Sequence, residues 1–417
     1  MTHSHTLYEW TPSDPIELTV AQRDAIARLA KGMSITPVQG AASCFRLTPD
    51  SNVGAIVVDD VSLAILPKPK ITLDHVLFML SYSLRLAVWD AAPFSFTEDS
   101  LVEAVVPAFV HEVSRAIRRG LLQGYKVEED ALPTVRGRIR FDDQLRYRFG
   151  RFPPAEVRFD EFTEDIDANR LIKAAANMLL RMRLRSPESR RALRRIDSVT
   201  ENVSLIEYDR ARLPEIAWTR LNEHYRHAVS LSQLVLRHCA FELPVDETGG
   251  RVHASSFLVD MNRVFEDFVR TAVRERLGLS EKAFPRGGTH PRLTLDDRGA
   301  ETGRIKLEPD LSWWEGPDCV FVGDVKYKRT GRHGENPDLY QLLAYTVAAD
   351  LPNGLLVYAA GEDAPTKHVV RHLNRTLEVM ALDLAGTPDQ LVAQTTVVAN
   401  RIVQQRACYK TELVGAA

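Results

Sequence analysis

The sequence predicts an α/β (α+β) protein of two or three domains. Its 417 residues are too many for one typical domain. A hydrophobic content of 45% and a charged content of 26% are typical of a globular chain with a full core. Helical periodicity and short β-like runs alternate along the chain. We expect a mixed β and helical region over residues 1–150, a helical region over 151–250, and an α/β domain over 251–417 whose central mixed sheet is flanked by helices.

The first region begins with short β segments and one helix, "TVAQRDAIARLAKGM". "AIVVDDVSLAILPK" predicts two strands joined by a hairpin turn at Asp59-Asp60. "LDHVLFMLSYSLRLA" and "EDSLVEAVVPAFVHEVSRAIRRG" have the apolar spacing of helices. From residue 121 to 162 the pattern returns to β, in "LLQGYKVEED", "TVRGRIRF" and "AEVRFDEF".

The middle region is predicted to be helical. "DIDANRLIKAAANMLLRMRL" is a long amphipathic helix, a second is expected at 188–203, and a third in "WTRLNEHYRHAVSLSQLVLRHC". The arginine cluster at 181–195 is interpreted as a solvated helix face, although arginine also suits phosphate contacts. The "DETGGR" break at 246–251 predicts the boundary with the last domain.

The last region predicts a compact α/β unit. A helix is expected over about 256–277, two strands over about 304–314 and 319–328, and a helix over about 338–349. "GLLVYAA" and "TKHVVRHL" predict two more strands, and a final helix is expected to start near Pro388.

Several classes of protein are disfavoured by the composition. The net charge of −3 does not suit a generally basic nucleic-acid coat protein, and the four scattered cysteines do not suit a zinc ribbon or disulfide framework. No apolar run reaches the roughly 18 residues of a membrane span, and the first residues lack a secretion signal. We therefore expect a cytoplasmic protein without membrane contact. Without a GxxxxGK[ST] loop, the chain is not expected to bind a nucleotide by that route.

Two carboxylates and a lysine lie close together in "EPDLSWWEGPDCVFVGDVKYK", residues 308–328. Side chains alternate along a strand, so Asp324 and Lys326 point to one face, and a hairpin-like pair of strands would bring Asp310 beside Asp324. Adjacent buried carboxylates repel unless a cation neutralises them, and Mg²⁺ prefers oxygen ligands. A nearby lysine can orient or deprotonate an attacking water, so the pattern favours metal-assisted phosphodiester hydrolysis.

A D-x-K sequence alone is common on surface strands and carries little information. The apolar run "CVFV" before Gly323 indicates an interior strand, where an unpaired charge is costly. Glu266 or its neighbour Asp267, in "NRVFEDFV", is expected to face the sheet, and Glu266 is the candidate fourth site residue. Gln341 could orient a phosphate or a nearby backbone group.

The pattern Pro309-Asp310 … Asp324-Val325-Lys326 resembles the PD-(D/E)xK nuclease superfamily. Most of the chain resembles the McrC family, the nuclease subunits of McrBC-type modification-dependent restriction systems. This resemblance includes "LYEW", "LAILPK", "VRGRIRF", "FDEFTEDIDANRLIKAAANMLL", "GDVKYK" and "YQLLAY", of which the "DEFTEDIDANRLIK" block is the most family-specific.

The resemblance implies a restriction-endonuclease-like C-terminal domain. Asp310, Asp324 and the Val325 carbonyl would hold Mg²⁺, Lys326 would be the catalytic lysine, and Glu266 would support them. It also implies a partner, a GTP-dependent McrB-type AAA+ hexamer that binds the GTP and recognises methylated DNA. The N-terminal region would engage that motor and stimulate its GTPase. The substrate would be double-stranded DNA, and cutting both strands would favour self-association.

Two alternatives stay open at this point. A standalone PD-(D/E)xK nuclease for repair or defence would cut DNA without a motor. A non-catalytic adaptor would keep the nuclease fold as a DNA-binding or assembly platform, although it would gain nothing from a repulsive acid pair. The DNA modification, the motor's nucleotide preference and the oligomeric state cannot be inferred from the sequence.

Overall fold

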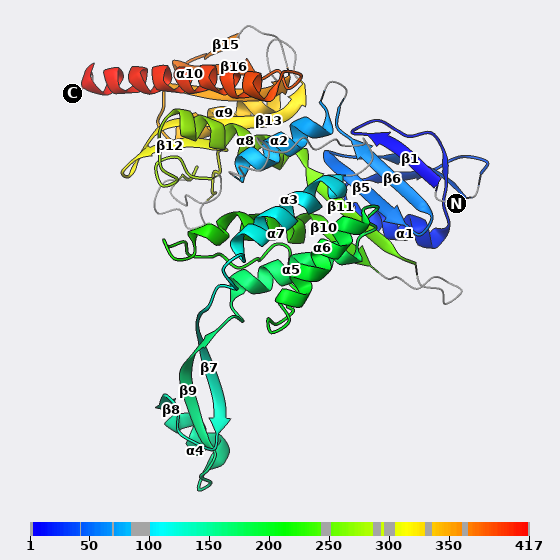
Figure 1. The fold of residues 1–417 in the computed structure, drawn as a ribbon. Helices are drawn as coiled ribbons and strands as arrows, with labels where there is room; N and C mark the ends of the chain where they lie inside the picture. The colour runs from blue at the N-terminus through cyan, green and yellow to red at the C-terminus, as the bar shows by residue number, and fades with distance from the viewer. Residues whose placement is uncertain are drawn as a thin grey trace.

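The protein was analysed as a computed structural model that describes residues 3–41, 43–68, 71–84, 101–242, 252–286, 293–295, 305–329, 336–360 and 366–415. Two five-stranded sheets lie in one body with helices between them, and a narrow arm projects from the body (Figure 1). The predicted mixed α/β fold class is confirmed. None of the described helices is both long and apolar enough to cross a membrane.

The N-terminal sheet has the strand order β1-β6-β5-β11-β10, in which β1 is parallel to β6 and the other pairs are antiparallel. α1 (Val20–Leu29) packs against β5 and β11, and a capping box at Thr19 begins it. The five strands are β1 (His3–Tyr8), β5 (Asn52–Val58), β6 (Val61–Leu66), β10 (Cys239–Glu242) and β11 (Ala254–Asp260). A small sheet beside them has the order β2-β4-β3, made of β2 (Ile16–Glu17), β3 (Ser34–Pro37) and β4 (Cys44–Thr48).

The prediction of a helix from residue 256 was wrong for its first turn, because Ala254–Asp260 forms β11 and the helix begins at Met261. β11 lies against β5 so closely that a Cβ at Gly54 would be 1.9 Å from the Phe257 carbonyl oxygen. Glycine is therefore required at position 54, where φ is +145°. The "DETGGR" segment, where a domain boundary was predicted, lies outside the described residues. The strands on either side of it, β10 and β11, pair with each other.

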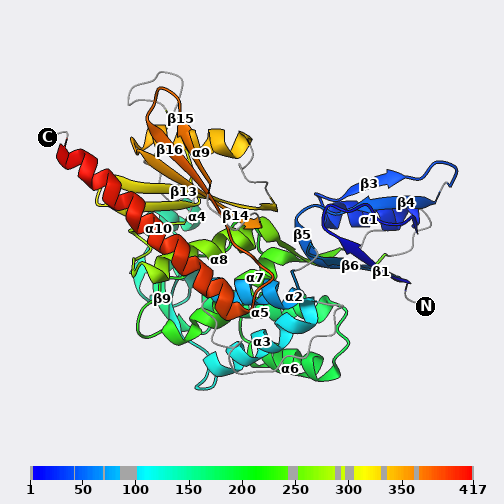
Figure 2. The same ribbon diagram turned by 90° about the horizontal axis from the view of Figure 1, so that it is seen from above.

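In Figure 1, α2 and α8 lie between the two sheets, and α3, α5, α6 and α7 lie below them. Figure 2 shows the same helices from above. α5 packs against α6 and α7, α3 packs against α6 and α7, and α2 packs against α8. Their buried apolar faces join one large core that continues into the C-terminal sheet. The helices are α2 (Leu73–Ser83), α3 (Leu101–Ala116), α5 (Asp167–Arg181), α6 (Pro187–Val199), α7 (Arg226–His238) and α8 (Met261–Arg276), with a short 3-10 turn η2 (Glu223–Tyr225) before α7.

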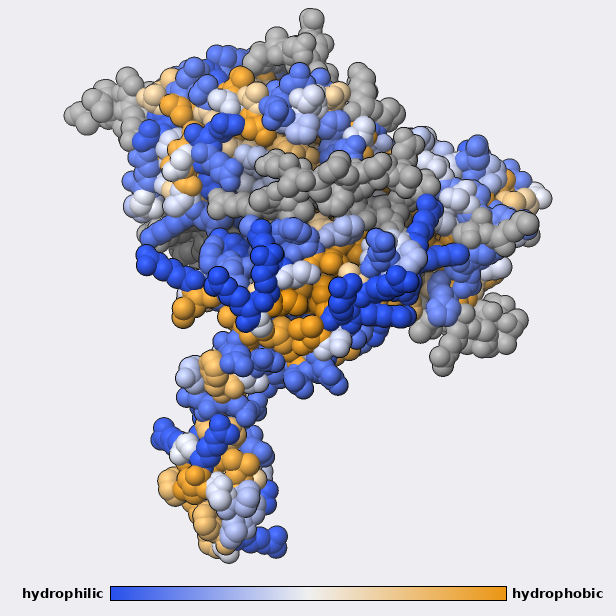
Figure 3. All heavy atoms as spheres, viewed as in Figure 1, coloured by the Kyte–Doolittle hydropathy of each residue, from blue (hydrophilic) through white to orange (hydrophobic). Residues whose placement is uncertain are grey.

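The arm is a long antiparallel pair of β7 (Gly124–Leu132) and β9 (Ala155–Thr163), with β8 (Arg138–Ile139) and α4 (Phe141–Arg148) at its far end. Its predicted β character is confirmed, and it spans the predicted boundary at residue 150. Large hydrophobic side chains are exposed along it (Figure 3): Tyr125, Phe141, Leu145, Tyr147, Phe149, Phe152 and Phe162. A projection this narrow has no core in which to bury them.

The C-terminal sheet has the order β12-β13-β14-β16-β15, with parallel β13, β14 and β16 in the centre and antiparallel β12 and β15 at the edges. One face of β13 packs against α8 and α10, and the other packs against α9. The strand "RTLEVMA", now β16, was not predicted. The elements are β12 (Leu311–Glu315), β13 (Asp318–Arg329), β14 (Asn353–Ala360), β15 (Thr366–Val370), β16 (Arg375–Ala381), α9 (Asn336–Ala348) and α10 (Pro388–Gly415).

Glu9, just after β1, connects the N-terminal region to the C-terminal sheet. Its side chain is buried, and Oε1 accepts a hydrogen bond of 3.2 Å from the Tyr327 hydroxyl. The Lys68 ammonium lies 4.6 Å from the centre of the Tyr327 ring. Glu9 Oε2 is buried and accepts no hydrogen bond from the described residues. Burial raises the pKa of Glu9 to about 8, although Lys68 and Tyr327 oppose this shift.

The raised pKa of Glu9 predicts a loss of stability as the pH rises from 4.5 to about 8. The folded state holds the Glu9 proton more tightly than the unfolded state, so this stabilisation is present below pH 4.5 and is lost as the pH rises to about 8. We expect the free energy of unfolding of Glu9→Gln to fall less between pH 5.5 and 8.5, by on the order of 1 kcal/mol or more. Urea unfolding of both proteins measures this. Parallel pH profiles would contradict the prediction.

Candidate active site

Asp324 and Lys326 lie on the same face of β13, as the alternation of side chains predicts. The Asp324 side chain is 1% exposed, and its Oδ2 lies 2.5 Å from Nζ of Lys326. Between them, Val325 points into the core shared with α8 and α10. The apolar strand β13 therefore holds Asp324 in a buried position, where its charge would be costly without Lys326.

Asp310 immediately precedes β12, and the antiparallel pairing of β12 with β13 places it beside Asp324. Leu311 lies opposite Gly323 in the register, so the next residue outward on each strand is an aspartate. The Val325 N–H donates a hydrogen bond of 2.9 Å to Asp310 Oδ2. The structure thus brings together the two carboxylates that the sequence placed on neighbouring strands.

The neighbouring acids disfavour the ionisation of Asp310. Burial raises the pKa of Asp310 well above its usual range, the charges of Asp324 and Glu266 contribute to the same shift, and the Val325 N–H opposes it. For Lys326, burial works to lower the pKa, but Asp324 and Asp310 outweigh it and the pKa is raised. Lys326 therefore stays charged beside Asp324.

Glu266 projects from α8 towards this group. Burial raises its pKa to about 7; Lys326 opposes the shift and Asp324 adds to it. Its neighbour Asp267 points elsewhere and binds Arg270 and Arg286. Gln341 on α9 donates a hydrogen bond of 2.7 Å to the Tyr345 hydroxyl, which donates to the Glu308 carbonyl at 3.3 Å. Gln341 is thus tied to the chain segment just before Asp310.

The residues present fit a hard divalent cation. Asp324 Oδ2 is buried. Nζ of Lys326 lies within ion-pair distance of this oxygen, but the oxygen accepts no hydrogen bond of ordinary geometry from the described residues. Asp310, Asp324 and the Val325 carbonyl offer oxygen atoms, which Mg²⁺ prefers. Among the described residues, no group of three or more histidine, cysteine and acidic side chains is arranged around one metal position. Two carboxylates and a carbonyl leave the remaining positions to water or substrate.

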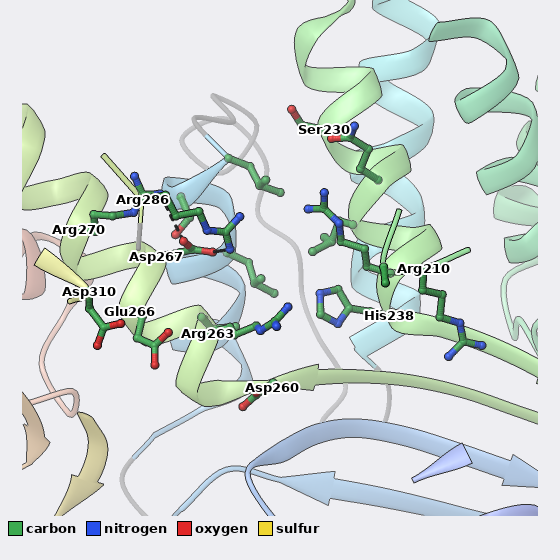
Figure 4. A pocket seen from close by; sticks show the side chains of 18 of the residues that line it. Arg210, Ser230, His238, Asp260, Arg263, Glu266, Asp267, Arg270, Arg286 and Asp310 are labelled. Atoms are coloured by element: carbon green, nitrogen blue, oxygen red, sulfur yellow. Dashed lines mark hydrogen bonds and ion pairs between the residues drawn. The ribbon is translucent and has the colours of Figure 1, made fainter. Parts of the chain in front are cut away.

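A cavity of about 820 Å³ opens beside Glu266 and Asp310 (Figure 4). Arginines from four parts of the chain line it, and the sequence analysis missed them as functional candidates. The signal was partly present, because Arg263, Glu266 and Arg270 follow the i, i+3, i+7 spacing of one helix face. The lining arginines are Arg210, Arg237, Arg263, Arg270 and Arg286.

Residues 47–359 match the family model described as "McrBC 5-methylcytosine restriction system component". The fold is similar to a chain in the refined half-complex from a tetradecameric assembly of Thermococcus gammatolerans McrB AAA+ hexamers with bound McrC. The TM-score is 0.53 with 17% identity, over 95% of this chain and 100% of that one. A cryo-EM structure of the Thermococcus gammatolerans McrBC complex gives a TM-score of 0.42 and 22% identity, over 66% and 88% of the chains. A comparison with curated proteins gave no match.

The Asp324–Lys326 pair predicts a measurable coupling energy. Lys326→Ala would leave Asp324 buried without its cation, and we expect this to cost about 2 kcal/mol of unfolding free energy, the side chain of Lys326 being partly exposed. Adding Asp324→Asn to that variant should restore most of the loss. Urea unfolding in EDTA measures both. If the double variant is no more stable than Lys326→Ala, the pair is not coupled.

Proposed function

The chain belongs to the family of McrBC 5-methylcytosine restriction system components, and we propose that it is the Mg²⁺-dependent DNA endonuclease subunit of such a system. It acts with a GTP-dependent AAA+ motor of the McrB type, stimulates the motor's GTPase, and cleaves methylated double-stranded DNA. The observation that carries the proposal is the buried Asp310–Asp324 pair with Lys326 at ion-pair distance. The description of the family supports the restriction system and the DNA mark.

The geometry suits hydrolysis of a phosphodiester. Asp310, Asp324 and the Val325 carbonyl would hold a divalent cation, which would supply positive charge at the phosphate and lower the pKa of a water molecule. Lys326 orients the attacking water and stabilises negative charge that builds on the phosphate. Glu266, with its pKa near neutrality, accepts a hydrogen bond from water at the other side of the group. Cutting both strands requires two such sites or two visits, so we propose that two copies meet at the substrate.

The arm is the element that we propose contacts the motor. It projects well away from both sheets (Figure 1), and its exposed aromatic side chains suit burial in a partner. The similar fold described as bound to McrB AAA+ hexamers supports the choice of partner. The arm is far from Asp310 and Asp324 in the sequence. Separate substitutions can therefore abolish partner binding and cleavage.

Asp324→Ala should abolish cleavage, by on the order of 1,000-fold or more, because it removes a carboxylate of the proposed metal site. The measurement is cleavage of methylated and unmethylated plasmid with Mg²⁺, with and without the AAA+ partner and GTP. Asp318→Ala is a matched control, since Asp318 is exposed on the same strand.

Each result separates the candidate functions. Cleavage that needs Asp324, the partner and GTP supports the motor-coupled nuclease. Cleavage by the wild-type chain alone indicates a standalone nuclease. No cleavage of either plasmid under any condition indicates an adaptor. Equal cleavage by Asp324→Ala and wild type would refute the assignment of Asp324 to the active site.

Replacing Tyr147 and Phe149 together by alanine should weaken partner binding by at least about tenfold, because exposed aromatic anchors dominate interface energies. Tyr147 is 65% exposed and Phe149 is 80% exposed. Tyr340→Ala is the control, since Tyr340 is 68% exposed on α9 in the C-terminal domain. Binding to the AAA+ protein is measured by calorimetry. Equal losses in the control and the arm variant would show that the arm does not bind the motor.

A further inference from the structure

The arginine-lined cavity next to the acid group lies between α7 and α8. Figure 4 shows Arg263 reaching into it between Glu266 and His238, with Arg270 and Arg286 gathered around Asp267. Arg237 comes from the end of α7 and Arg210 from the segment before it. The cavity thus continues directly from Glu266 and Asp310 to the guanidinium groups of these arginines.

Five arginines and five acidic residues line the cavity, but not every arginine is paired with an acid. Asp267 binds Arg270 at 3.3 Å and Arg286 at 2.7 Å. Arg237 and Arg263, in contrast, have no hydrogen bond or ion pair with any residue that the structure describes. Nε of Arg270 is buried and likewise donates no hydrogen bond to the described residues. Guanidinium groups are thus left available to an anion that enters the cavity.

These arginines also lie close enough to repel one another. Burial lowers the pKa of Arg237, and the charges of Arg286 and Arg263 lower it further, while Asp267 opposes the shift. Glu215 also opposes the shift, but the pKa of Arg237 is lowered on balance. Asp260 caps α8 and accepts hydrogen bonds from Ser51 and Asn262. Holding cations together at a cavity is costly unless an anion joins them.

We propose that this cavity binds the phosphodiester backbone of the DNA strand that runs to the acid group, with Arg237 and Arg263 contacting phosphates. The inference rests on the proposed nuclease function and deepens it. Arginine is suited to this role because its planar guanidinium donates two hydrogen bonds to one phosphate. Such contacts position the strand without reading its sequence, so they serve methylated and unmethylated DNA equally.

The test is binding of a fluorescein-labelled 20-base-pair duplex to the full chain in EDTA, measured by anisotropy over a range of salt concentrations. Arg237→Ala combined with Arg263→Ala should weaken binding by at least about tenfold. It should also reduce the slope of log affinity against log salt by about 0.9 for each phosphate that the variant no longer neutralises. Methylated and unmethylated duplexes should lose affinity equally. The control replaces Arg191 and Arg194, two exposed arginines on α6, by alanine and should leave both values unchanged.

Lysine at both positions should keep the salt slope but recover only part of the affinity, because lysine retains the charge and lacks the paired hydrogen bonds. The proposal is overturned if the double alanine variant binds with the affinity and slope of wild type, or if the wild-type chain binds no duplex at low salt. Failure of the nuclease function is a separate result. Cleavage by Asp324→Ala would refute the active-site assignment. It would not change the DNA affinity of the arginine variant, so the two failures are distinguishable.

Discussion

The burial of two carboxylates beside one another is the constraint on which the rest of the C-terminal domain depends. Asp324 is nearly inaccessible to solvent, Asp310 is held against it by the Val325 N–H, and Lys326 supplies the nearby positive charge. An isolated buried charge is expensive, and a repulsive pair is more so. The sheet positions these groups on the apolar strand β13 and at the start of β12, the antiparallel strand beside it. A divalent cation bound between the two carboxylates would neutralise this repulsion.

Local patterns in the sequence were sufficient to find that group. Alternation along β13 places Asp324 and Lys326 on one face, and a short connection to β12 brings Asp310 alongside, so no long-range information was needed. The same holds for the arm strands and for α5, whose apolar spacing is regular. The metal roles of these residues are still predictions, since geometry alone does not identify a ligand.

Features that depend on distant partners were not found from the sequence. β11 reads as the first turn of a helix until its pairing with β5 is known, because the periodicity of a short apolar run is ambiguous. Arg237 and Arg263 lie 26 residues apart and meet only when α7 packs near α8. The hydrogen bond between Glu9 and Tyr327 joins residues 318 positions apart. It holds β13 on the face opposite Lys326, so the N-terminal region is attached to the strand that carries the candidate catalytic lysine.

The pairing of β5 with β11 has a consequence for how the chain is made. Val58 pairs with Ala254, so β5 leaves the ribosome almost 200 residues before its neighbour. At about 5–20 residues per second, one edge of the N-terminal sheet stays open for roughly 10–40 s of synthesis. An open edge of apolar residues is a template for aggregation, and chaperones are the usual protection. Any shortened version of the protein that keeps residues 1–70 must therefore also carry residues 254–260.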